Sequence, residues 1–280
     1  MSIAEQPAQT VRLAHEVRGG GPPLVLLAGT GYAGATWGDA LVASLSRQFT
    51  VITFDYRGTG KTQGTDDDYT TRLFAADTIR LIDELDLGPA HVLGHSMGGR
   101  VAQWVAIDAP ARVRSVVLAA SGPGEFRPGR QPQTGIPLAN AIALIENGFE
   151  RTIADQIRST FFTPEFAASA PDTVERLVRR FWDNRPSLRD YLKHVIARQG
   201  HRTVDRLAEI VQPCLVIVGD RDTHVAGTGS HLDQSRYLAE HLPDAILSVV
   251  PGVAHGLFWQ DPDPVVAEVV QFLEANPAQP

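Results

Sequence analysis

The chain has 280 residues, of which 43% are hydrophobic and 20% are charged, and its formal net charge is −7. This composition is that of an ordinary globular protein, and the length suits one large α/β domain with a full core. The negative charge argues against nucleic acid as a partner, because binding phosphates requires a basic face. No apolar run approaches the ~20 residues that span a bilayer, and the first residues lack the pattern of a signal peptide. We therefore expect a cytoplasmic protein that does not bind membranes.

Short runs rich in Val, Ile and Leu alternate with longer amphipathic segments. Such runs, without polar alternation, are typical of strands covered on both faces of a parallel sheet, and their alternation with helices implies right-handed crossovers. The single cysteine, Cys214, lies in one run, so we expect it to be buried. Residues 10–17 predict an edge strand or hairpin. The other expected strands are 24–28, 50–54, 91–93, 113–119, 214–218 and 245–250, and the expected helices are 39–46, 71–85, 98–107, 235–241 and 264–273.

The strand and helix rhythm stops between about Gly122 and Pro213. A stretch rich in glycine and proline gives way there to helical patterns. We interpret residues 122–212 as a helical lid inserted into a core made of residues 1–121 and 213–280; the alternative is that these helices flank the sheet. The helical patterns cover residues 138–150, 151–162, 172–182 and 187–199.

A G-x-S-x-G motif, Gly94-His95-Ser96-Met97-Gly98, follows an expected strand and precedes an expected helix. This context is typical of a nucleophile elbow, in which serine occupies a tight, strained turn. The glycines remove side chains that would collide where strand and helix approach. The following helix directs its N-terminal amides at the site, so the Met97 amide can donate to an oxyanion. We predict Ser96 as the nucleophile.

A serine hydroxyl needs a neighbouring base. His255 follows the last expected strand, and its position completes the chain order Ser, Asp, His that is typical of this arrangement. The remaining histidines show no pattern beyond packing or surface roles. They are His15, His91, His95, His194, His201, His224, His231 and His241.

The third member should be a carboxylate that fixes the tautomer of His255. Asp220 and Asp222 both follow the strand 214–218, and we choose Asp222 because a residue further past the strand end can reach the histidine loop. Asp220 is better placed to pair with Arg221 or to cap the turn. The segment after strand 113–119 has no carboxylate before Glu125, which weakens that alternative.

A second oxyanion donor should come from the loop after the first parallel strand, Ala28-Gly29-Thr30-Gly31, and the Thr30 amide is our candidate. An ordinary glycine-rich turn is the alternative. Gly29, Gly31, Trp182 and the aromatic position 258 (Phe258) are further candidates for contact with a substrate. Phe161, Phe162, Phe181 and Tyr191 are candidate pocket walls or lid packing residues. Arg179, Arg180 and Arg189 could meet a substrate carboxylate, although a solvated helix face is the preferred interpretation.

These motifs resemble those of the α/β-hydrolase superfamily. The stretch Asp55-Tyr56-Arg57-Gly58-Thr59-Gly60 resembles its Asp-x-Arg-Gly-x-Gly turn, and Gly219-Asp220-Arg221-Asp222 resembles its acid-bearing turn, whose last Asp is the catalytic acid. Residues 96–104 are similar to the 3-oxoadipate enol-lactonase and aminoacrylate-hydrolase branch. The chain departs from the superfamily at Ala28-Gly29, where His-Gly is common, and at the stretch 226–231 after the acid turn. This stretch could adjust the mouth of the pocket or form a surface loop, and we prefer the surface loop.

The resemblance implies a mostly parallel sheet flanked by helices and a serine hydrolase that forms an acyl-enzyme from a small ester, lactone or other activated carbonyl. Hydrolysis of a C–C bond or an amide uses the same residues, and a ligand-sensing protein on this scaffold is the alternative from another class. No P-loop or dinucleotide fingerprint is complete, and no histidine and carboxylate cluster has metal-ligand spacing, so no cofactor or metal is expected. The expected partner is a small molecule, and the expected state is a monomer or homodimer.

Overall fold

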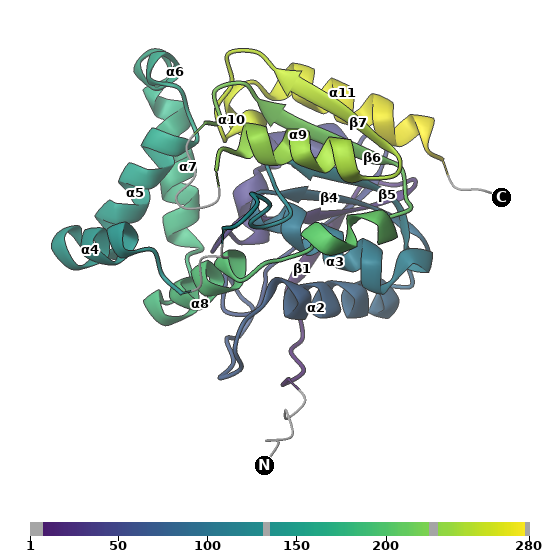
Figure 1. Cartoon of the computed structure of the whole chain (residues 1–280), viewed down its shortest axis with the longest axis horizontal. Coiled ribbons are helices and arrows are strands. Elements are labelled where there is room, and N and C mark those ends of the chain that lie inside the picture. The colour runs from purple at the N-terminus through teal and green to yellow at the C-terminus, as the bar shows by residue number, and fades with distance from the viewer. Residues whose placement is uncertain (1–7, 131–134, 224–228, 278–280) are drawn as a thin grey trace.

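A central sheet organises the computed structural model, which describes residues 8–130, 135–223 and 229–277 (Figure 1). Its seven strands lie in the order β1-β3-β2-β4-β5-β6-β7. Strand β1 is antiparallel to β3, and every other neighbouring pair is parallel. The strands are β1 His15–Arg18, β2 Pro23–Leu27, β3 Thr50–Phe54, β4 Ala90–His95, β5 Val113–Ala119, β6 Cys214–Gly219 and β7 Ala245–Val250.

The central strands β2, β4, β5 and β6 are almost wholly buried, which explains why their sequences run through Val, Ile and Leu without alternation. The expected strands are all present, and the segment 10–17 contributes the short edge strand β1. Cys214 is buried, and burial raises the pKa of its thiol to about 12. The prediction of a mostly parallel sheet flanked by helices is confirmed.

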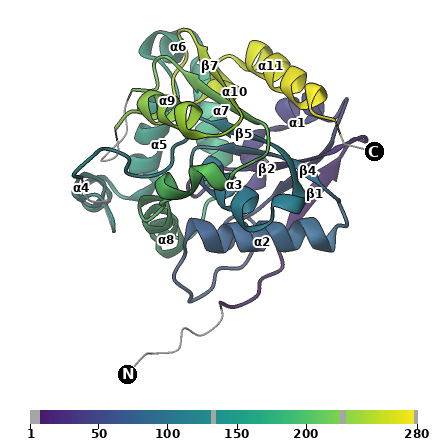
Figure 2. The same ribbon diagram turned by 45° about the vertical axis from the view of Figure 1, so that its right-hand side comes forward.

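Helices cover both faces of the sheet (Figure 2). Helices α1 and α11 contact each other on one face, and α2 and α3 pack together on the other, while α9 packs against β6 and β7. None of the helices in the described ranges has both the length and the apolar content to cross a bilayer. These helices are α1 Asp39–Leu45, α2 Thr71–Glu84, α3 Met97–Asp108, α9 His231–His241, α10 Leu257–Gln260 and α11 Pro262–Ala275, with 3₁₀ turns at Gly34–Trp37, Pro110–Arg112 and Val204–Glu209.

The helices between β5 and β6 form a group beside the end of the sheet to which the strands point (Figure 1). They are α4 Leu138–Asn147, α5 Phe149–Thr160, α6 Pro164–Ser169, α7 Pro171–Asp183 and α8 Leu188–Gln199. Two expectations were wrong in detail. The pattern 138–150 is divided at Gly148, whose φ of 77° ends α4, and α6 was not expected. The separation into core and lid stays a prediction.

Candidate functional site

Ser96 lies in the turn between β4 and α3, with φ 56° and ψ −117°, a backbone conformation that is strained for a residue with a side chain. The turn requires its glycines, because a Cβ on Gly98 would lie 2.0 Å from the Leu27 carbonyl oxygen and one on Gly94 would lie 2.3 Å from the Gly98 backbone. The Ser96 amide donates to the Ala119 carbonyl at 2.9 Å. Strand–helix contact therefore holds the serine in the expected elbow.

His255 follows β7, and Asp222 follows β6, so neighbouring strand ends bring the two side chains together. His255 Nδ1 lies 2.7 Å from Asp222 Oδ2, and both residues are buried. Burial by itself raises the pKa of Asp222, but the adjacent imidazoles of His231 and His255 lower it by a larger amount. The pKa of Asp222 therefore lies below its ordinary value. Asp222 is therefore an ionised acceptor, and His255 Nδ1 carries the proton.

Asp220, the alternative acid, is placed differently. Its Oδ1 accepts the Gly252 amide at 2.8 Å, and its side chain is 37% exposed. It also lies 3.7 Å from Arg221 Nε. These contacts match the turn-capping role considered for Asp220, and they leave Asp222 as the carboxylate beside His255.

A cavity of about 250 Å³ lies at the ends of the strands, and residues of α4, α5, α7 and α8 line its other side. Ser96 and His255 both line it, with Gly29 and Thr30 from the loop after β2. No hydrogen bond joins the Ser96 hydroxyl to His255 among the described residues. Catalytic hydrogen bonds of this type commonly tighten only when substrate is present.

The amides of Thr30 and Met97 have no hydrogen-bond acceptor within the described ranges. Met97 is the first residue of α3, where backbone N–H groups lack intrahelical partners. Two hydrogen bonds hold the segment that directly follows Thr30. The Gly31 amide donates to His194 Nδ1 at 3.4 Å, and the Gly34 amide donates to Asp55 Oδ1 at 2.8 Å. Thr30 lines the same cavity as Ser96, and Met97 follows Ser96 in the chain, so both amides lie near the site without an acceptor; their role as oxyanion donors stays a prediction.

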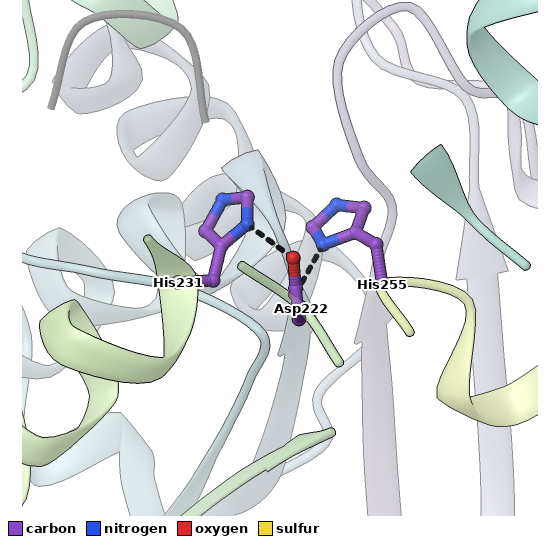
Figure 3. Close-up of side chains that lie close together, drawn as sticks. All are labelled: Asp222, His231 and His255. Carbon is purple, nitrogen blue, oxygen red and sulfur yellow. Dashed lines mark hydrogen bonds and ion pairs between the residues drawn. The ribbon is translucent and has the colours of Figure 1, made fainter. Parts of the chain in front are cut away.

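His231 is the residue that the sequence did not reveal. It begins α9 and is buried, and its Nδ1 donates to Asp222 Oδ1 at 3.0 Å, so that the two imidazoles share one carboxylate (Figure 3). Burial lowers the pKa of His231 to about 4. The expectation of a surface loop over 226–231 is wrong for His231, whereas 226–228 lie outside the described residues. The capping pair Ser230 and Asp233, in which the Ser230 hydroxyl accepts the Asp233 amide, is the signal that marks this helix start.

Asp222, His231 and His255 also offer ligand atoms that all lie within 4.8 Å of one another. The positions of these three residues in the sequence do not match the ligand spacing of a known metal site. Two histidines and a carboxylate are a donor set that zinc or iron can use. Here, however, both oxygens of the ionised Asp222 accept Nδ1 protons, so a metal bound between these atoms would have to displace both protons. The absence of a metal stays a prediction.

The end of α5 supports the histidine loop. The His255 amide donates to the Thr160 carbonyl at 3.3 Å, and the Gly256 amide donates to the Phe161 carbonyl at 2.8 Å. The Phe161 ring meets the His255 ring edge-on, with centroids 5.1 Å apart. Beneath the site, buried His95 Nε2 donates to the His255 carbonyl at 2.9 Å. His255 is therefore held from both the sheet and the helical group.

Several further candidates do not line the cavity. Gly31 has a φ of +73°, and a Cβ on it would lie 2.8 Å from the Tyr191 ring. Its amide donates to His194. Trp182 packs on Phe149 and lies under Arg185, and Phe258 is buried against Trp37 and His95. Of the aromatic candidates, those that line the cavity are Phe161, Phe181 and Tyr191.

The chain is similar to known proteins over nearly its whole length. The family model for the alpha/beta hydrolase fold matches residues 22–262. The chain is 32% identical to the "Putative non-heme bromoperoxidase BpoC" of Mycobacterium tuberculosis (strain CDC 1551 / Oshkosh), covering 94% of this chain and 97% of the relative. It is 30% identical to the "Putative carbamate hydrolase RutD" of Caulobacter sp. (strain K31), covering 95% of this chain and 97% of the relative. The crystal structure of the enol-lactonase from Burkholderia xenovorans LB400 superposes with a TM-score of 0.81 at 24% identity. The match covers 94% of this chain and 97% of the lactonase chain. The chain belongs to the α/β-hydrolase family.

Proposed function

We propose that the protein is a serine hydrolase that cleaves a small ester, lactone or other activated carbonyl through an acyl-enzyme. The observation that carries the proposal is one cavity lined by a serine in a strained turn, by Thr30, whose amide has no acceptor among the described residues, and by a histidine paired with a buried carboxylate. Each of these features serves acyl transfer: a nucleophile, an oxyanion site and an oriented base.

In the proposed reaction, His255 Nε2 takes the Ser96 hydroxyl proton as Oγ attacks the carbonyl carbon. The Thr30 and Met97 amides donate to the oxyanion, and Asp222 stabilises the imidazolium. When the tetrahedral intermediate collapses, His255 gives the proton to the leaving group, and an ester bond to Ser96 remains. Water, deprotonated by His255, then attacks this ester, and the proton returns to the Ser96 oxygen as the acid leaves.

The test is turnover on a panel of 4-nitrophenyl esters, lactones and a carbamate, combined with fluorophosphonate labelling. The panel includes a carbamate because a relative carries that activity in its name. We expect sustained turnover and labelling of Ser96, both lost in Ser96→Ala, while the Ser96→Ala variant stays folded by circular dichroism. Wild-type turnover in Ser96→Ala would refute the nucleophile. Labelling of Ser96 combined with ester hydrolysis that stops after a single turnover would favour a ligand-sensing protein on the same scaffold.

A further inference from the structure

Arg198, near the end of α8, lines the same cavity as Ser96 and His255. Its side chain is partly buried, and the described part of the chain gives its guanidinium no hydrogen bond or ion pair. Guanidinium groups that leave water are normally paired with acids, because an uncompensated charge is costly to bury. This cation therefore lacks the partner that a structural role requires.

The described walls of the cavity contain no Asp or Glu side chain. Asn140, Gln156 and Thr152, which line the same cavity as Arg198, have neutral polar side chains. Behind Arg198 lies a second buried cation, Arg100, which donates to the Arg198 carbonyl at 2.7 Å. Burial and the nearby charge of Arg198 lower the pKa of Arg100 to about 9. This end of the cavity is therefore electropositive and without an acid of its own.

Some arginines of the helical group are paired with acids. Arg189, at the start of the same helix, is exposed and lies 2.6 Å from Asp66, and Arg158 pairs with Glu175. Arg179 and Arg180 have no ion pair within the described ranges, but neither lines the cavity. Arg198 differs from all of these because it both lines the cavity and has no acid partner among the described residues.

We propose that Arg198 is the specificity residue of an anion subsite, and that the substrate carries a carboxylate at the end remote from its reacting carbonyl. This inference rests on the proposed hydrolysis at Ser96. A guanidinium fork matches a carboxylate with two parallel hydrogen bonds. A carboxylate is favoured over a dianionic phosphate because the Nη atoms of Arg100 already donate to the Arg198 carbonyl and Gln234, so among the described residues the subsite offers one free cation.

The test compares matched substrates that differ only in the terminal charge. One series is the 4-nitrophenyl monoesters of five- to seven-carbon dicarboxylic acids; the other is the 4-nitrophenyl esters of unbranched monocarboxylic acids of equal carbon number. Rates are corrected for hydrolysis without enzyme. We expect wild type to prefer the anionic member of at least one pair by about tenfold to a hundredfold in kcat/KM, as charged hydrogen bonds imply.

In Arg198→Met this preference should disappear through a higher KM for the anionic ester, whereas kcat/KM for the neutral ester should change much less. Arg198→Lys should keep part of it. Arg189→Met, the matched control on α8, should keep all of it. The melting temperature of Arg198→Met should be unchanged or higher, because an unpaired buried cation is replaced by an apolar side chain. An equal ratio in wild type and Arg198→Met would overturn the subsite, as would a preference for a phosphorylated ester over the carboxylate.

The two proposals fail separately. Hydrolysis of neutral esters without an anionic preference would leave the serine hydrolase intact and remove the subsite. If no ester is cleaved and Ser96 is not labelled, the proposed function fails, and the subsite is then judged by calorimetric titration with pimelate. Binding by wild type and Arg189→Met but not by Arg198→Met would support the subsite, and no binding by wild type would overturn it.

Discussion

His231 and His255 lie face to face, with ring centroids 4.3 Å apart and planes 19° from parallel, and each donates an Nδ1 proton to a different oxygen of Asp222 (Figure 3). The shared carboxylate is thereby fixed from both sides. A carboxylate held by a single imidazole could rotate about its own bond, and the orientation of His255 would follow. His231 therefore has the geometry of a positioning residue for the base.

Replacing His231 should separate this role from simple packing. His231→Phe keeps a stacked ring but leaves one oxygen of a buried carboxylate without a donor, so we expect kcat to fall about tenfold at similar KM and stability to fall by about 1.5–3 kcal/mol. His231→Gln retains an N–H donor and should recover most of kcat. Ester kinetics with urea denaturation of both variants measure this. Equal kcat in wild type and His231→Phe would show that the residue only packs.

The acid can be assigned by comparing two neighbouring aspartates. Asp222→Asn removes the charge that stabilises the imidazolium and favours the wrong His255 tautomer, so we expect kcat to fall by about 10⁴-fold, the size of this effect in a serine protease triad. Asp220→Asn keeps an oxygen that can accept the Gly252 amide and should stay within a few-fold of wild type. Steady-state kinetics on one ester measures kcat for both variants. A larger loss of kcat in Asp220→Asn than in Asp222→Asn would assign the acid to Asp220.

Much of the fold was predictable because burial leaves a direct mark on sequence. Strands β3, β5 and β7 begin and end at the expected residues. The glycines around Ser96 indicate in the sequence the close contact between strand and helix that requires them. The expected helix 235–241 begins four residues late because apolar periodicity does not extend to the start of α9, which Ser230 and Asp233 mark by capping. Helix α6 was missed for the same reason, although Thr163 accepts the Phe166 amide and Pro164 stands at its first position.

The cavity walls could not be predicted in the same way. The arginines of the helical group look alike in sequence, and which of them faces the cavity depends on how α8 packs against the core. The same holds for aromatic residues: Phe181 lines the cavity, while its neighbour Trp182 packs on Phe149. Helix rotation and crossing angle set these outcomes, and both depend on contacts between distant segments.

The approach of α3 to β2 predicts a large cost for a single methyl group. In Gly98→Ala the new Cβ would meet the Leu27 carbonyl oxygen at 2.0 Å and the Ala28 carbonyl oxygen at 2.7 Å, so the helix must shift. We expect a loss of about 3 kcal/mol or more in unfolding free energy, the upper range for overpacking. Urea denaturation measures it. Gly20→Ala, where nothing lies within 4 Å, is the control and should change stability by less than about 1 kcal/mol.

Buried histidines predict a protein that loses stability in mild acid. Burial lowers the pKa of His91, His194 and His231 to about 4 and that of His95 to about 3. In the unfolded chain these groups titrate near 6.5, so between about pH 6.5 and 4 the unfolded state binds more protons. Unfolding free energy should therefore be fully retained above pH 6.5 and fall as the pH drops through this window.

His91→Gln tests this with a residue outside the cavity, because His91 Nδ1 contacts the Ser115 hydroxyl at 2.8 Å and glutamine can keep a hydrogen bond there. One histidine contributes at most about 1.4 kcal/mol per pH unit to the slope. Urea denaturation at several pH values should therefore give a shallower slope for His91→Gln than for wild type between pH 4.5 and 6.5. Parallel slopes would mean that His91 takes up its proton in the folded protein as readily as in the unfolded chain. The acid sensitivity would then have to come from the other buried histidines, His95, His194 and His231.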